Sequence, residues 1–449
     1  MTDFWESLKY QKQIMNRIVL IGNGFDLAHG MPTRYIDFID SYFRELCEKV
    51  TSENLGYVNE DVTLKLTSGI PLLNTRGGPY KFSDIKSYKN LIEYLYQYID
   101  VYGYESADLK FTNSFFETIC TNYQNQNYQW VDIENDYFDE LIKFINKGRL
   151  KENIDAVNKF NDDVKKVEQL LGKYLTKVEE KYSAREAIND IYNIIYTTID
   201  SEDIAISSYD DYCDSLEYII NEYIGLEENR QVSRVNALSK IFKQHDLYKS
   251  FNDQFIDEYI DDIKQIKITD KNLTKTPQYF LLPKQVLFLN FNYTATDLLY
   301  KTAISKHISI HGELDEKKNN PIILGFGDEF CDEFPQLENL RDNSFVKQIK
   351  SSRYSHTNNY REFLKFVEDD LYQVIVLGHS CGNTDRTLLR TLFEHKNCCS
   401  IKPYYFETEN GDNHNELVMS ISRIFANKAN MRDRVVNKGY CKPIPQNKN

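Results

Sequence analysis

Five short segments place residues capable of hydrogen bonding or proton transfer directly after apolar runs. In the first, Gly22, Asn23 and Gly24 follow Ile18 to Ile21, and Asp26 comes two residues later. The others are Asn290-Phe291-Asn292-Tyr293-Thr294, His311-Gly312, Gly325-Phe326-Gly327-Asp328 and Gly378-His379-Ser380. Glycine lets a backbone turn tightly and approach a phosphate closely, and Asp, Asn and His can orient or deprotonate a reactant. Together they indicate a nucleotide site, although the glycine spacing does not fit the dinucleotide fingerprint G-x-G-x-x-G.

The runs that precede these segments are typical of strands buried in a sheet. Ile18 to Ile21 is a continuous apolar run, and strand character returns after residue 285. The later runs are Val286 to Asn292, His307 to Gly312, Pro321 to Gly327, Val374 to Ser380 and Ser400 to Phe406. An amphipathic helix is predicted over residues 385–395, between the last two strands. Strands interleaved with helices favour an α/β fold with a Rossmann-like, doubly wound parallel sheet, whose ligands bind at the carboxyl ends of the strands.

The middle of the chain has a different, helical pattern. Apolar residues recur with the helical period between Ile154 and Val178, and residues 54–80 are predicted to be a loop. We therefore expect residues 14–53 and 281–430 to form one nucleotide-binding domain, interrupted by a mainly helical insertion or cap over residues 54–280. Residues 431–449 are expected to be a frayed tail.

Composition narrows the class of protein. The 449 residues carry a net charge of −14, which opposes broad nucleic-acid binding through phosphate neutralisation. No run reaches the roughly 18 apolar residues of a membrane span, and the N-terminus does not resemble a signal peptide, so we expect a cytoplasmic protein without membrane contact. The eight cysteines lack metal-ligand spacing, and we expect them to be reduced, mostly buried thiols and no metal to be bound.

The five segments resemble the motifs of sirtuins, in the sirtuin order. "GNGFDLAHGMP" (22–32) is similar to the sirtuin G-A-G-I-S-x-x-x-G-I-P segment, "FNYT" to the segment with the catalytic Asn, and "IHG" to the segment with the catalytic His. "NPIILGFGDE" (320–329) is similar to Pro-x-x-x-x-Phe-Gly-Glu, and "LGHSCG" (377–382) to the ribose-binding Gly-Thr-Ser-Leu segment. Thr294 stands where sirtuins have Asp, and no zinc module follows His311, which argues against peptide deacylation.

A second resemblance covers both ends of the chain and part of the insertion. "IGNGFDLAHGMPTRY", "WVDIE" (130–134), "FNYT", "HG" and "GHSCGNTD" are similar to the AbiH family of bacteriophage abortive-infection proteins. The resemblance implies a bacterial antiphage defence effector. Its expected partners are a nucleotide, a phage-derived trigger or partner defence protein, and a second copy of the chain.

The sirtuin resemblance implies cleavage of the bond between nicotinamide and ribose in NAD or a related nucleotide. Such a reaction passes through an oxocarbenium-like transition state and needs a positioned water and a base. The expected catalytic residues are His311 as the base, Asn292 to position water or the carboxamide, and Asp26 to bind a ribose hydroxyl or stabilise the developing cation. The expected ligand-binding residues are Gly22, Asn23, Gly24, Phe25, Tyr293, Thr294, Gly378, His379, Ser380 and Asp385.

A purely structural role for the same residues also remains a possible interpretation. Asn292 and His311 can simply complete turns, and Asp26 can be a charge in the first turn of a helix. Trp130, Asp132 and Glu134 can line the pocket or begin a helix. Two other functions also remain: a nucleotide-sensing module without turnover, which Thr294 favours, and a nuclease effector, which the acidic charge opposes.

Overall fold

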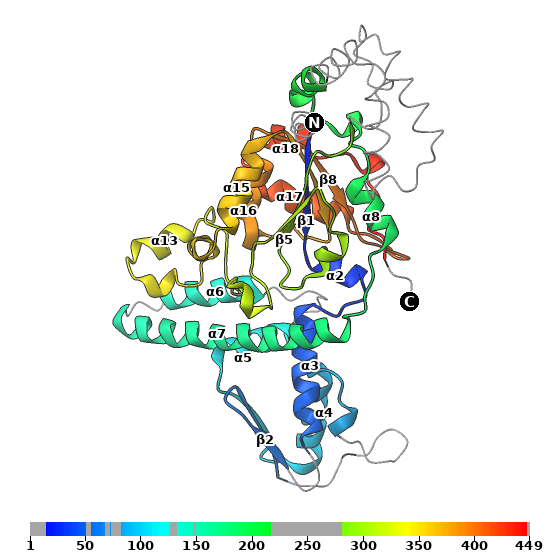
Figure 1. The fold of residues 1–449 in the computed structure, drawn as a ribbon. Helices are drawn as coiled ribbons and strands as arrows, with labels where there is room; N and C mark the ends of the chain where they lie inside the picture. Colours follow the sequence, from blue (N-terminus) through cyan, green and yellow to red (C-terminus); the bar gives the residue numbers. More distant parts are fainter. Residues whose placement is uncertain are drawn as a thin grey trace, which may run out of the picture. The chain divides into compact units, whose positions relative to one another are not determined.

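A five-stranded parallel sheet organises the first of two units of the chain (Figure 1). The computed structural model describes residues 15–50, 55–67, 72, 82–125, 133–146, 150–216 and 281–446. The sheet order is β6-β5-β1-β7-β8. Its strands are β1 (Asn16–Ile21), β5 (Val286–Asn290), β6 (Ser305–Ser309), β7 (Tyr372–Leu377) and β8 (Cys398–Tyr404). The predicted parallel sheet is confirmed, because β1 pairs in parallel with both β5 and β7.

The sheet is covered on both sides, which explains why its strands read as continuous apolar runs. Val19, Ile21 and Phe288 belong to one apolar cluster with Ile191 and Ile195 of α8 (Asn189–Tyr196). Helices α15 (Asn359–Asp369) and α16 (Arg386–Phe393) contact the edge strands β6 and β8 and lie on the other side of the sheet in Figure 1. Two further helices of this unit, α17 (His414–Ile424) and α18 (Lys428–Arg434), pack near β8.

One arginine lies inside this core, at the amino end of the sheet. Arg17 is only 2% exposed, and burial lowers the pKa of its guanidinium to about 10. Its Nη1 donates to the carbonyls of Ile195 and Thr197, at 2.9 and 2.8 Å, just where α8 ends. Its Nε and Nη2 donate to Oε1 of Gln373 on the neighbouring strand β7. Arg17 therefore joins the last turn of α8 to the central strands.

The expected frayed tail is wrong for the described residues up to 446. Ile444 is 6% exposed and belongs to the same apolar cluster as Val19. Its backbone N–H donates to the carbonyl of Tyr405, and Val436 N–H donates to Ile401. The apolar residues in this otherwise polar stretch pack beside β8, and that packing orders the segment.

The second unit consists of residues 31–184 and 313–355. Its helices are α3 (Tyr35–Glu48), α4 (Tyr88–Tyr102), α5 (Ser114–Asn125), α6 (Ile133–Asn146), α7 (Leu150–Lys181), α13 (Phe334–Asn339) and α14 (Lys350–Arg353). The helical period from residue 154 to 178 is confirmed by the single long helix α7. Its buried Phe160 packs against Phe115 of α5 and Tyr137 of α6.

Two predictions for this part of the chain are wrong. Residues 54–80 were expected to be a loop, but β2 (Gly56–Val58) and β3 (Val62–Leu66) form an antiparallel sheet with β4 (Ala107–Phe111). Residues 321–327 were expected to be a strand of the parallel sheet, but they lie in the second unit, where Phe326 makes a single bridge to Ile349. The unit boundaries at residues 30 and 312 also differ from those expected at 53 and 280.

Replacing Arg17 tests its role as an anchor. Arg17→Met should lower the free energy of unfolding by about 3 kcal/mol or more, because several buried oxygens lose their donor at about 1–3 kcal/mol each. Urea denaturation of the full chain measures this change. Arg432→Met, at an exposed arginine of α18, is the control and should cost under about 0.5 kcal/mol. If the two substitutions lowered the free energy of unfolding equally, Arg17 would not be an anchor of this kind.

Candidate functional site

The loops that follow β1 and β7 touch through their backbones. Helix α2 (Asn23–Ala28) begins directly after β1, and Gly24 N–H donates to the carbonyl of Gly378 at 2.8 Å. A Cβ on Gly378, whose φ is +75°, would lie 2.1 Å from the nitrogen of Phe25. A Cβ on Gly22 would lie 2.6 Å from Cα of His379. This close contact accounts for the glycines that prompted the nucleotide hypothesis, and phosphate binding by them stays a prediction.

Asp26 of α2 is a buried carboxylic acid at this edge of the sheet. It is 1% exposed, and its Oδ2 accepts a hydrogen bond of 2.6 Å from Oγ1 of Thr294. Its pKa is raised from 3.8 to about 6, chiefly by burial and also by the charge of Asp297, whereas Thr294, Thr296 and Arg185 oppose the rise. The group thus changes protonation near neutral pH, where a catalytic acid or base is most effective.

Asn292 joins the end of β5 to the end of β1. Its Nδ2 donates to the carbonyl of Gly22 at 3.0 Å, and the residue is half-buried. The neighbouring Tyr293 and Thr294 are buried. The turn over residues 291–294 therefore contributes both Asn292 and the hydroxyl that meets Asp26.

His311, His379 and Asp385 form a second polar group at the same edge. His311 Nε2 lies 3.2 Å from Asp385 Oδ1, and His379 Nε2 lies 3.5 Å from Asp385 Oδ2. His379 Nδ1 accepts the N–H of Cys381 at 2.9 Å, so the ring carries its proton on Nε2, facing the carboxylate. All three are less than a tenth exposed, and the ring of Phe291 contacts both imidazoles edge-on. One carboxylate therefore orients two histidines that come from different strand ends.

The remaining predicted site residues differ in their surroundings. Phe25 is fully buried and packs against His29 and Tyr300, so its side chain is part of the core. Asn23 is half-buried and Ser380 is exposed. Among the described residues, then, the structure brings most of the predicted set to the carboxyl edge of one sheet.

The other segments that the sequence singled out do not belong to this edge. The Gly325 to Asp328 segment lies in the second unit, where a Cβ on Gly325 would be 2.0 Å from the carbonyl oxygen of Gln348. Glu134, also in that unit, forms a buried ion pair of 2.7 Å with Lys350. Trp130 and Asp132 lie outside the described residues.

Three residues beside the site were not predicted from the sequence. Asn290, Asp297 and His307 form a hydrogen-bonded row next to the turn over residues 291–294. The alternation in "HISIHG" predicts a strand correctly, but it does not reveal that His307 faces a carboxylate ten residues earlier. The sequence places Asn290 among the polar residues at the end of a strand, but it does not predict a role for this side chain.

The described residues contain no group of three or more His, Cys, Asp or Glu side chains arranged to hold a metal ion. All eight cysteines are free thiols, and seven of them are buried, as expected. No helix in the described ranges has the length and apolar character needed to cross a bilayer.

The backbone contact between the two loops can be tested at its tightest point. Gly378→Ala should destabilise the protein more than Gly411→Ala, because both introduce strain at positive φ, about 1–3 kcal/mol, but only Gly378→Ala also adds a clash with backbone. Gly411 has φ +131° and nothing within 4 Å of an added Cβ. Thermal unfolding of both variants gives the comparison, and equal losses would argue against the contact.

The buried acid predicts a pH dependence of stability. Asp26 loses its proton near pH 3.8 when unfolded and near 6 when folded, so the folded state binds more protons between these values. Its contribution to stability therefore falls as pH rises from about 4 to about 6, by about 3 kcal/mol in all. Asp26→Asn should remove this slope and raise the free energy of unfolding at pH 8. Denaturation curves from pH 4 to 8 measure it, with the exposed Asp162→Asn as control. An unchanged slope in Asp26→Asn would show that the acid titrates normally.

Comparison with known proteins agrees with the second of the two resemblances seen in the motifs. No curated protein and no solved structure matches the chain. One family model, described as "Bacteriophage abortive infection AbiH", matches residues 18–406. This match spans most of the chain and includes β1 from Ile18 onward, α2, the turn over residues 291–294 and the His311–Asp385–His379 group. The chain belongs to the AbiH family of bacteriophage abortive-infection proteins.

Proposed function

We propose that this chain is an abortive-infection effector that binds a nucleotide at the carboxyl edge of its parallel sheet and hydrolyses NAD or a related nucleotide there. Loss of NAD would stop metabolism in an infected cell before phage are released. The family supports the role in defence. The reaction rests on the site, and chiefly on the contact between His311 and Asp385.

That contact suits His311 to act as a base. A carboxylate 3.2 Å from Nε2 holds the imidazole with its proton on Nε2 and stabilises the imidazolium that forms when the ring accepts a second proton on Nδ1. Burial of both groups keeps the pair out of water, where the carboxylate would be less effective. A histidine oriented in this way can accept a proton from a bound water molecule.

The proposed reaction is a hydrolysis of the N-glycosidic bond. The bond from the ribose C1′ to nicotinamide breaks, and nicotinamide leaves as a neutral molecule with the bonding electron pair. Water adds to C1′, and its proton passes to His311, giving ADP-ribose. Asn292, fixed by its bond to Gly22, would orient the water or the carboxamide.

A carboxylate is also available to the developing positive charge. Sirtuins have Asp at the position of Thr294, and here the Thr294 hydroxyl instead donates to Asp26. Above its pKa of about 6, Asp26 is an anion in a buried setting, where its attraction for an oxocarbenium ion is strongest. This placement supports the roles proposed for Asp26 and Thr294.

A second function, nucleotide sensing without turnover, is favoured by one observation. Asp26 and Asp385 already make contacts within the protein, the former with Thr294 and the latter with both histidines. Carboxylates engaged in this way can shape a binding site without reacting.

The two functions separate in assays of purified protein with NAD. If the protein is a hydrolase, His311→Ala and Asn292→Ala should each lower kcat by about 10² or more, because each removes a group that acts on the reacting water. Chromatography of nicotinamide and ADP-ribose measures the rate. His356→Ala, at an exposed histidine of the same unit, is the control and should leave the rate unchanged.

Calorimetry with ADP-ribose and phage challenge of cells complete the test. Protection that falls in step with the rate supports the hydrolase. Protection that persists in variants without hydrolysis, while ADP-ribose still binds, supports the sensor. Absence of both binding and turnover in the wild-type protein would overturn the nucleotide proposal.

A further inference from the structure

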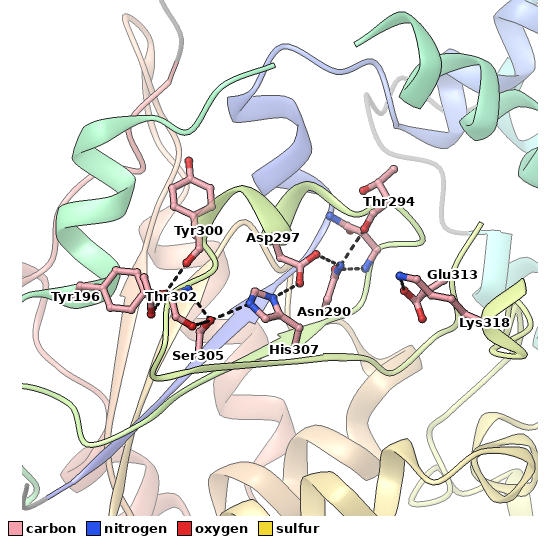
Figure 2. Close-up of polar contacts among 11 residues, drawn as sticks. Tyr196, Asn290, Thr294, Asp297, Tyr300, Thr302, Ser305, His307, Glu313 and Lys318 are labelled. Carbon is pink, nitrogen blue, oxygen red and sulfur yellow. Dashed lines mark hydrogen bonds and ion pairs between the residues drawn. The ribbon is translucent and has the colours of Figure 1, made fainter. Parts of the chain in front are cut away.

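A row of hydrogen bonds runs from the edge strand β6 to the turn over residues 291–294 (Figure 2). Ser305 Oγ lies 3.1 Å from His307 Nε2, and His307 Nδ1 lies 2.7 Å from Asp297 Oδ2. Asp297 Oδ1 accepts a bond of 3.0 Å from Asn290 Nδ2. The strand register explains the arrangement, because Asn290, His307 and Ser305 all lie on the same face of the sheet.

Asn290 holds the turn at both ends. Its Oδ1 accepts the backbone N–H of Asn292 at 2.8 Å, and its Nδ2 donates to the backbone carbonyl of Thr294 at 3.0 Å. The side chain is 1% exposed, so water does not compete for these bonds. A buried amide that bonds two backbone groups of one turn restricts the conformation of that turn.

Asp297 and His307 in turn hold Asn290. Asp297, in the short helix η6 (Thr296–Tyr300), is 2% exposed, and its carboxylate accepts hydrogen bonds from the side chains of Asn290 on β5 and His307 on β6. The His307 ring lies flat against Phe288, with centroids 4.4 Å apart and an angle of 3° between the planes. This stacking fixes the ring, so that Nδ1 faces Asp297 and Asp297 faces Asn290.

We infer that Asn290, Asp297 and His307 are positioning residues that hold the turn over residues 291–294 in register with the end of β1. The turn meets β1 and α2 through three hydrogen bonds: from the Phe291 N–H to Ile21, from the Asn292 side chain to Gly22, and from the Thr294 hydroxyl to Asp26. Without this row of hydrogen bonds, the turn loses the contacts that fix the orientation of Asn292 and Thr294. The effect on turnover rests on the proposed function, whereas the effect on the turn does not.

The experiment uses the full chain and two substitutions, each of which breaks the row at one residue. Asn290→Asp keeps an acceptor for Asn292 but cannot donate to Thr294 or Asp297. His307→Leu removes the donor to Asp297, and His307→Asn restores an N–H donor at a similar place. Asn397→Asp is the matched control, because Asn397 Nδ2 also donates to backbone carbonyls, those of Val367 and Glu368, away from the turn.

Hydrogen exchange of peptides that cover residues 288–300 is the direct readout. Exchange should be faster in Asn290→Asp and His307→Leu than in the wild type, His307→Asn and Asn397→Asp. With NAD, the same two variants should lose about 10² in kcat while KM stays close to that of the wild type, because misplacement of a reacting group affects the chemical step most.

The outcomes separate this inference from the proposed function. If the wild-type protein does not turn over NAD but the turn exchanges as described, the proposed function fails and the inference stands. If the wild-type protein hydrolyses NAD and His307→Leu matches it in kcat and in exchange, the inference is overturned. If Asn290→Asp does not fold, the comparison of His307→Leu with His307→Asn decides alone, and failure of His307→Asn to restore the wild-type exchange also overturns the inference.

Discussion

The contact between the backbones of Gly24 and Gly378 is the constraint on which the rest of the site depends. β1 is the central strand, and its neighbours β5 and β7 come from residues more than 260 positions later in the chain. Because α2 begins at the end of β1, any displacement of the β7 loop displaces Asp26 as well. Glycine is needed at these positions for reasons of space, whether or not a ligand approaches them.

The first unit buries charge at both ends of its strands and accommodates it in two ways. At the amino end, Arg17 keeps its proton because carbonyls at the end of α8 and the amide of Gln373 surround it. At the carboxyl end, Asp26 has fewer hydrogen-bond partners than Arg17 has, and burial shifts the pKa of Asp26 upward. The hydrogen bonds of Arg17 hold α8 in place, whereas the raised pKa of Asp26 leaves this carboxyl group able to exchange a proton. The two ends of one sheet thus differ in chemistry although they share a core.

Much of the sheet, and the placement of the candidate site residues at one edge of it, could be predicted because both depend on local patterns. The apolar runs at β1, β5 and β7 are continuous, and the polar residues that follow them meet because parallel strands end at one edge. The prediction of a strand over residues 321–327 is wrong, because a short apolar run with glycines is also compatible with a packed loop such as the one around Gly325 and Gln348. Asp297 and His307 could not be paired from sequence, since their contact depends on how a 3₁₀ turn folds over the sheet. The pKa of Asp26 was equally hidden, because burial is a property of the assembled core.

The order of the strands has a consequence for synthesis on the ribosome. The candidate site takes Asp26 from the beginning of the chain, Asn292 and His311 from about two thirds of the way along it, and Asp385 from nearer its end. About 360 residues separate the first of these from the last, which corresponds to roughly 20–70 s of translation at about 5–20 residues per second. A nascent or truncated chain that stops before β7 has neither a complete sheet nor a complete site. For a member of a family of abortive-infection proteins, this arrangement delays any activity of the candidate site until nearly the whole chain has been made and quality control has had its opportunity to act.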